Sequence, residues 1–333
     1  MTIEELEQKK QKCLFELNSL EHDPKREIEL IAQIDTYESI IENKKAKAKA
    51  KVSSLSEEVA KEVPEEFSNE DLEEIFNEDL EETFNEVPGE VSKIVFEEVS
   101  KAEELPNAVE LYKKGMDLLE EDNISPALDL FTKSAELGYV KAQFQLGNMY
   151  FSGQGVSQNL SKAAEWYQKA ADQNNTKAQY TLGCMYEDGK GVVQDHSKAA
   201  ELFQKAADKG FAKAQYCLGL MYEEGRGTAQ DLSKAIEWYQ KAADKGLVTA
   251  QYNLGLMYYN GKGVAKDYSK AAAWYQKAAD KGSVNAQYNL GLLYDFGRGL
   301  PKNPGKAKAW YKRAASQGHE KAAKRLAQLE GQE

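Results

Sequence analysis

Apolar positions recur with a period of 36 residues over most of the chain. Five successive units begin AQFQLGNMY, AQYTLGCMY, AQYCLGLMY, AQYNLGLMY and AQYNLGLLY. Within one unit, Ala178, Leu182 and Met185 recur at the three- to four-residue spacing of a helix face, and a second segment repeats this spacing at Ala199 and Phe203. Each unit is therefore predicted to be a pair of helices. The predicted pairs occupy residues 142–177, 178–213, 214–249, 250–285 and 286–321.

Residues typical of turns and helix caps mark the helix ends in every predicted pair. A Gly-x-Gly turn follows each first segment, where a residue with positive φ ends a helix most easily. Each second segment follows an Asn or Asp whose side chain accepts hydrogen bonds from first-turn amides. These predicted N-caps are Asn159, Asp195, Asp231, Asp267 and Asn303. A glycine closes most second helices, and Asn174 takes its place in the first unit.

The unit AQYNLGLMYYNGKGVAKDYSKAAAWYQKAADKG, residues 250–282, resembles the Sel-one-like repeat, a relative of the tetratricopeptide repeat. The resemblance covers residues 142–321. Residues 110–141 resemble an ordinary tetratricopeptide repeat, and residues 322–333 resemble a capping helix. The resemblance implies an all-α protein in which residues 105–333 form an α/α solenoid of tandem helical hairpins.

The same resemblance implies that the first helices line a concave groove that binds a protein or peptide. The candidate residues are aromatic, apolar or acidic. They are Tyr180, Tyr216, Tyr252, Tyr288, Leu220, Leu256, Leu292, Glu187, Asp188, Glu223 and Glu224. Such a groove favours a partner with basic and apolar side chains, because carboxylates pair with cations and aromatic rings accept guanidinium groups. The alternative is that the tyrosines are structural and the carboxylates are solvated helix ends.

Charge divides the chain into three regions. The protein has 43 basic and 55 acidic residues and a net charge of −12. Residues 1–51 are nearly balanced, residues 52–104 carry 19 acidic and 3 basic side chains, and residues 105–333 are slightly basic. A negative protein repels polyanions, so the lysines of the second helices are predicted to form a solvated outer face, and no nucleic-acid partner is expected.

The amino-terminal 51 residues contain two apolar stripes separated by Asp23 and Pro24. The stripe before this break includes Leu6 and Leu17, and the stripe after it includes Ile31 and Ile34. A helical hairpin within one chain and a short coiled coil between two chains both bury these residues. Dimerisation through residues 1–51 therefore stays open.

Residues 52–104 form an acidic segment that contains a short tandem repeat, NEDLEEIF followed by NEDLEETF. On a helix, five apolar residues of these repeats share one face, which makes them a candidate interaction motif. They are Leu72, Ile75, Phe76, Leu80 and Phe84. The segment is either a disordered linker or an amphipathic helix. We also consider that it docks on the lysine-rich second helices of the solenoid and acts as a regulatory or second contact region.

The chain shows no arrangement of residues for catalysis, metal binding or a cofactor. Its three histidines and three cysteines are scattered, and the five Gly-x-Gly turns lack the context of a phosphate loop. We therefore expect a non-enzymatic adaptor or scaffold. A hydrolase-like enzyme or small-ligand binder is disfavoured, because cysteine-rich relatives discussed as β-lactamases carry a regular cysteine pair in each repeat and this chain does not.

Targeting signals are also absent from the pattern. No apolar run is long enough to span a membrane, and the start MTIEELEQKKQKC does not resemble a secretory signal. These features predict a cytoplasmic protein without membrane insertion. They leave open export by a specialised secretion system, and with it the alternative of a bacterial effector or regulator that acts on a host or envelope partner.

Overall fold

The computed structural model describes residues 3–19, 26, 29–31, 33–42 and 108–331. Every regular element among these residues is helical, as the sequence predicts. Residues 33–42 and 108–120 are helical. The labelled helices are α1 (Ile3–Ser19), α4 (Ile124–Glu136), α5 (Val140–Ser152), α6 (Leu160–Asp172), α7 (Thr176–Asp188), α8 (His196–Asp208), α9 (Ala212–Glu224), α10 (Leu232–Asp244), α11 (Val248–Asn260), α12 (Tyr268–Asp280), α13 (Val284–Phe296), α14 (Pro304–Ser316) and α15 (Glu320–Glu330). None of them is long and apolar enough to cross a membrane.

The described residues fall into two compact units. The first contains those of 1–9 and 35–143, and the second contains those of 10–34 and 144–333. In the first unit, the Tyr112 hydroxyl donates a hydrogen bond to Ser39 Oγ at 3.0 Å, and Lys141 pairs with Glu42 at 3.1 Å. The Tyr112 ring also packs against Phe131, 5.5 Å away between centroids. Residues 35–42 are thus held against the first repeat helices of this unit.

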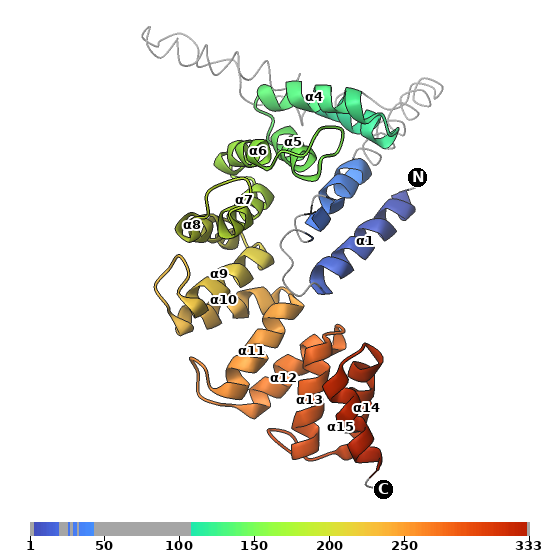
Figure 1. Cartoon of the computed structure of the whole chain (residues 1–333), viewed down its shortest axis with the longest axis vertical. Helices are drawn as coiled ribbons and strands as arrows, with labels where there is room; N and C mark the ends of the chain where they lie inside the picture. Colours follow the sequence, from blue (N-terminus) through green and yellow to red (C-terminus); the bar gives the residue numbers. More distant parts are fainter. Residues whose placement is uncertain (1–2, 20–25, 27–28, 32, 43–107, 332–333) are drawn as a thin grey trace, which may run out of the picture. The chain divides into compact units, whose positions relative to one another are not determined.

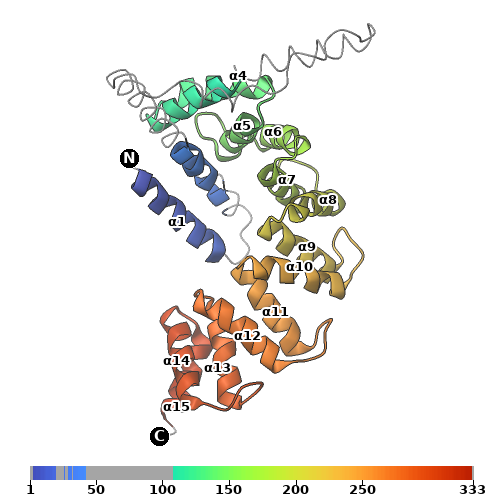
Figure 2. The same cartoon turned by 180° about the vertical axis from the view of Figure 1, so that it is seen from behind.

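The second unit contains the stacked helix pairs. Helix α7 packs on α8, α9 on α10, α11 on α12 and α13 on α14. The second helix of each pair then packs on the first helix of the next pair. Figure 1 shows the pairs in chain order from α7 to α15, and Figure 2 shows the same stack from behind. This arrangement is the solenoid of helical hairpins that the repeat pattern predicts.

In each pair, an aromatic ring of the second helix packs against a glycine of the first helix. A Cβ added to Gly183 would lie 2.7 Å from Cε1 of Phe203, so only glycine allows this approach. Tyr180 packs against the same Phe203 ring, with centroids 5.8 Å apart. The equivalent tyrosines of the second helices, Tyr167, Tyr239, Tyr275 and Tyr311, are also fully buried.

The turns and caps follow the sequence prediction. Gly189 ends α7 in the left-handed conformation, with φ of 68°. Asp195 then caps α8 by accepting hydrogen bonds from the amides of Ser197 and Lys198, both at 3.0 Å. The other four predicted N-caps make the same kind of bond, and Asn174 has a positive φ of 65°.

A buried glutamine joins each pair to the preceding one. Gln179 Nε2 donates to the carbonyl of Ala171 at 3.2 Å, and Gln215 Nε2 donates to that of Ala207 at 3.0 Å. Gln143, Gln251 and Gln287 make the equivalent bond to residues 135, 243 and 279. These bonds go to carbonyls near the end of each preceding second helix, where no amide within the helix is left to donate to them.

Candidate partner-binding face

The candidate residues of the first helices share one helix face, which we call the first-helix face. In α7 it consists of residues 177, 180, 181, 184, 187 and 188, and the other first helices present their equivalents at steps of 36 residues. Spacings of three, four, seven and eleven residues place side chains on one side of a helix. The face is therefore continuous along each first helix.

The predicted tyrosines differ in exposure along the stack. Tyr180 is fully buried between Phe203 and Phe211, whereas Tyr216, Tyr252 and Tyr288 are half-buried. The three half-buried rings each pack on the tyrosine of their own second helix, with centroids 5.6 to 5.9 Å apart. Each of them therefore supports its own repeat and also presents part of its ring on the first-helix face.

The predicted leucines lie beside these tyrosines. Leu220, Leu256 and Leu292 are half-buried and pack at the margins of three successive apolar clusters. The equivalent position is Asn148 in α5 and Cys184 in α7, and both of these side chains are buried. The apolar part of the face is therefore most accessible towards the carboxyl-terminal repeats.

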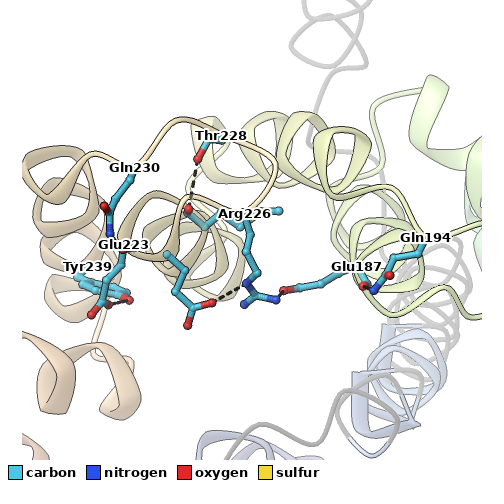
Figure 3. Close-up of polar contacts among 9 residues, drawn as sticks. Glu187, Gln194, Glu223, Arg226, Thr228, Gln230 and Tyr239 are labelled. Atoms are coloured by element: carbon cyan, nitrogen blue, oxygen red, sulfur yellow. Dashed lines mark hydrogen bonds and ion pairs between the residues drawn. The ribbon is translucent and has the colours of Figure 1, made fainter.

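The predicted acidic residues are paired within the chain. Arg226 contacts Glu187 at 2.9 Å and Glu224 at 2.5 Å, as Figure 3 shows for Arg226 and Glu187. Lys262 contacts Glu223 at 2.7 Å, and Lys190 contacts Asp188 at 2.9 Å. Each of the four predicted carboxylates thus has a cationic neighbour. These residues, at the carboxyl ends of the first helices, form what we call the margin of the first-helix face, and the pairing lowers its attraction for a basic partner.

The cations come from the middle position of the Gly-x-Gly turns, which the sequence prediction treated only as turns. Arg226 bridges from its turn to Glu187, 39 residues earlier, and Lys262 bridges to Glu223 over the same separation. Arg298 continues the series by donating to the Tyr259 hydroxyl at 2.9 Å. The signal was present in the sequence, because this position is Lys or Arg in the last four of the five turns.

The last repeat ends the series with a contact to α15. Arg325 contacts the buried carboxylate of Asp295 at 2.9 Å. Asp295 also accepts a hydrogen bond from the Tyr311 hydroxyl at 3.1 Å. Acidic and basic groups are therefore paired at the carboxyl ends of α7, α9 and α13, whereas Tyr259 takes the acidic position on α11.

Two buried tyrosines donate to this margin. The Tyr239 hydroxyl donates to Glu223 Oε2 at 2.5 Å, and Figure 3 shows the two side chains together. Burial, and then the bond to Glu223, raises the pKa of Tyr239 far above its ordinary value of 10.0. Burial and the charge of Asp295 raise the pKa of Tyr311 in the same direction. Both hydroxyls therefore remain protonated donors near neutral pH.

Polar side chains on the amino-terminal part of the face are buried without hydrogen-bond partners. Both amide atoms of Gln145 and the hydroxyl of Thr181 are in this state. Their counterparts on α11 and α13, Asn253 and Asn289, are half-buried. The same face is thus closed on α5 and α7 and more open on α11 and α13.

The predicted outer face carries lysines that lie over aromatic rings. Lys198 lies 5.2 Å from the Tyr186 ring centre, and Lys241 lies 3.7 Å from that of Trp238. Both lysines are exposed, which fits the interpretation of a solvated face. These contacts cover apolar ring surface while leaving the ammonium groups in water.

The predicted cysteines are buried, and the predicted motif of residues 72–84 lies outside the residues that the structure describes. Cys13, Cys184 and Cys217 are buried and are not joined in disulfides. The described residues contain no group of three metal-ligating side chains. The proposed motif Leu72, Ile75, Phe76, Leu80 and Phe84 lies outside the described residues, as does all of 52–104.

Comparisons with known proteins agree with this architecture. The Sel1 repeat family model matches residues 108–139, 140–175, 176–211, 212–247, 248–283 and 284–319. The first of these matches covers the segment that the sequence analysis compared with a tetratricopeptide repeat. No curated protein matches the chain.

Two solved structures resemble the chain at 34% sequence identity. The first is c5321, a protective antigen present in uropathogenic Escherichia coli strains that displays an SLR fold, with a TM-score of 0.66. The match covers 70% of this chain and 51% of that one, so the chain spans about half the length of c5321. The second is a Sel1 repeat protein from Oxalobacter formigenes, with a TM-score of 0.58 and coverage of 65% of this chain and 86% of that one.

Proposed function

Because the chain belongs to the Sel1 repeat family, we propose that its repeats act as a non-enzymatic scaffold that binds a partner protein. The Sel1 repeat fold commonly serves protein–protein interaction. The partner site that we propose lies on the first-helix face of α11 and α13. A scaffold of this kind needs a rigid, accessible surface with apolar anchoring points rather than a reactive group.

One observation carries this proposal: α11 and α13 present the same half-buried pattern of aromatic and aliphatic side chains. Tyr252 and Leu256 on α11 are repeated by Tyr288 and Leu292 on α13. Asn253 and Asn289 stand beside them and supply amide groups on the same face. Aromatic and leucine surfaces flanked by amides suit an apolar or amphipathic peptide segment of a partner.

The expected basic character of the partner rested on acidic side chains with no cation beside them. Glu187, Asp188, Glu223 and Glu224 are instead each paired with Arg or Lys. We therefore propose a partner that is recognised mainly by its apolar side chains, with charged residues of both signs at its rim.

The test compares polar substitutions on this face with a matched substitution at the start of a second helix. The test variant carries Leu256→Asn and Leu292→Asn, because Asn148 shows that the repeat accommodates Asn at this position. The control is Leu232→Asn, because the half-buried Leu232 occupies the position that His196 fills in the preceding repeat. Each full-length variant is used for affinity purification with quantitative mass spectrometry from the native cells.

We expect one protein to be enriched by the wild type and the control and to be at least tenfold depleted with the double variant. Retention by the double variant at the level of the control would place the partner elsewhere on the chain. If folded wild-type protein enriches nothing, the scaffold proposal is wrong, and a small ligand becomes the alternative to pursue.

The acidic segment 52–104 is proposed as a second contact region, on the basis of its charge and tandem repeat alone. If it docks on the lysine-rich second helices, attraction should weaken as salt is added. Its removal from the full chain should therefore change partner binding at low salt more than at high salt. Equal effects at both salt concentrations would contradict an electrostatic role.

A further inference from the structure

The described residues among 10–34 share one compact unit with the described repeats of 144–333. Internal contacts link the two ends of this segment. Arg26 pairs with Glu16 at 2.7 Å and with Glu29 at 3.4 Å, and the Cys13 thiol donates to Gln33 Oε1 at 3.5 Å. Side-chain contacts therefore join the carboxyl-terminal half of α1 to the described residues among 26–34, and we call these described residues together the amino-terminal segment.

The apolar side chains of the amino-terminal segment are buried on more sides than the segment itself can cover. Leu30 is 0% exposed and Ile31 is 4% exposed, and Ile34 and Leu17 are also buried. Adjacent helical residues point about 100° apart, so α1 alone does not enclose both Leu30 and Ile31. A second surface must cover them, and the repeats are the described residues that share this unit with the segment and contact it.

A direct contact identifies that surface as the first-helix face of α9. Lys213 Nζ donates a hydrogen bond to the carbonyl of Leu17 at 3.2 Å, and Lys213 is only 8% exposed. The equivalent residues of α11 and α13 are Thr249 and Asn285, and both are half-buried. Lys213 therefore marks the point where the face changes from covered to open.

Electrostatics favours a lysine at this end of α1. Leu17 lies in the last turn of α1, where the carbonyls accept no hydrogen bond from amides of the same helix. The last turn of α1 contains no basic residue, so the helix does not supply its own cation there. A cation at the carboxyl end of a helix interacts favourably with the helix dipole. Lys213 supplies this charge from a residue 196 positions away.

Burial along the stack changes near the same helix. Thr181, Cys184 and Cys217 are buried, whereas their equivalents Asn253 and Leu256 on α11 are half-buried. Helix α9 is intermediate, because Lys213 and Cys217 are buried while Tyr216 and Leu220 are half-buried. Gln145 and Thr181, on the part of the face that precedes α9, are buried without hydrogen-bond partners. Such burial is unfavourable.

We propose that the amino-terminal segment is an intramolecular ligand of the first-helix face of α5, α7 and α9, and that Lys213 recognises the carboxyl end of its helix. The occupied surface is a binding site for an amphipathic helix, and in this state the amino-terminal segment fills it. This site is separate from the partner site proposed on α11 and α13. The segment therefore limits access to one half of the first-helix face while leaving the other half open.

The three cysteines provide a test in the full-length protein. Cys13 lies in the amino-terminal segment, and Cys184 and Cys217 lie on the face that it covers. Labelling with N-ethylmaleimide, followed by peptide mass spectrometry, measures how often each thiol becomes exposed. If the segment is bound, all three thiols should react slowly in the wild type.

Two variants release the segment in different ways. Lys213→Thr removes the cation and uses the residue that α11 carries at this position, so the repeat fold is preserved. Leu30→Asp places a charge in the buried stripe of the segment and leaves the repeats unchanged. We expect about tenfold faster labelling of all three thiols with Lys213→Thr, from the loss of one charge-assisted hydrogen bond, and faster labelling still with Leu30→Asp. The matched control, Lys205→Met, changes an exposed lysine of α8 and should leave the rates unchanged.

The possible outcomes separate clearly. Fast labelling of Cys184 and Cys217 in the wild type, or unchanged rates with Leu30→Asp, would overturn the proposal. Acceleration by Lys205→Met equal to that by Lys213→Thr would also overturn it, because the effect would not be specific to the helix end. Slow labelling that becomes faster when the protein is diluted would assign the occupant to a second copy of the chain. Circular dichroism and thermal unfolding of each variant show whether the repeats remain folded.

Discussion

Tyr239 shows how one side chain serves both the core and the margin of the first-helix face. Its ring packs on Tyr216 within the repeat, and its hydroxyl donates to Glu223. Glu223 also contacts Lys262 from the next repeat. The carboxylate that the sequence suggested as a site for a basic partner is therefore occupied by two groups of the protein itself.

This environment predicts how the protein responds to alkaline pH. The pKa values of Tyr239 and Tyr311 are raised above 10.0, first of all by burial. A group whose pKa is raised by folding stabilises the folded state fully below its unfolded pKa, and this stability is lost as the pH rises above that value. We expect the protein to lose stability above about pH 10.

Absorbance at 295 nm should show a phase that coincides with the unfolding of the helices, because the buried Tyr239 and Tyr311 ionise only as they become exposed. Tyr239→Phe should lower the amplitude of this unfolding phase by one tyrosine. Tyr294→Phe, a change of a half-buried tyrosine at the end of α13, is the comparison. A single titration phase with intact helical circular dichroism would contradict this expectation.

At the scale of a helix, local sequence signals specify where the elements begin and end. The N-caps Asp195 and Asp231 and the left-handed Gly189 and Gly225 take the conformations that the sequence predicts. These features depend on bonds between residues two to four positions apart, and such bonds can be recognised in a sequence. Gly183 is different, because its role depends on a ring that lies 20 residues away in the partner helix.

Two glycine substitutions in helices should therefore have opposite effects. Gly183→Ala places a methyl group against the Phe203 ring and should lower the free energy of unfolding by about 2 kcal/mol. Gly305→Ala lies in the first turn of α14, where the nearest atom to a new Cβ is Asn303 Oδ1 at 3.5 Å. It should raise stability by about 0.5 kcal/mol.

Urea unfolding followed by circular dichroism measures both changes under the same conditions. Equal effects of the two substitutions would show that helix propensity, rather than the contact between the two helices, determines the result at Gly183.

At the scale of the whole molecule, stability in a stack of repeats is transmitted between neighbours. The last apolar cluster of the described repeats contains Tyr311 and Ala322, with Leu326 and Leu329 packed against it. Arg325 of α15 forms an ion pair with Asp295 of α13. Helix α15 thus covers the apolar surface of the preceding pair, and the free energy of this contact supports α13 and α14.

A charge placed in this contact should loosen the end of the stack and leave distant repeats unchanged. With Leu326→Asp, amide hydrogen exchange should become about tenfold faster in α14 and α15 and should stay at the wild-type rate in α7 and α8. Lys324→Asp places the same charge at an exposed position of α15 and serves as the control. Faster exchange along the entire stack would indicate one cooperative unit rather than neighbour-by-neighbour coupling.

The sequence by itself determined the repeat period, the helical hairpins and their caps. These properties follow from hydrophobic spacing within single helices and from side-chain bonds across a few residues, so one chain read alone contains them. It also identified a first-helix face rich in tyrosine and leucine. The residues of that face share one side of a helix regardless of how the repeats are arranged relative to one another.

Only the tertiary structure decided which parts of that face are open. The pairing of Glu187 with Arg226 and the bond from Lys213 to Leu17 join residues 39 and 196 positions apart. Such contacts depend on how successive pairs rotate against one another and on where the amino-terminal segment packs. Identical repeat positions therefore differ in burial between α7 and α11, because burial is decided by neighbours that the repeat pattern does not contain.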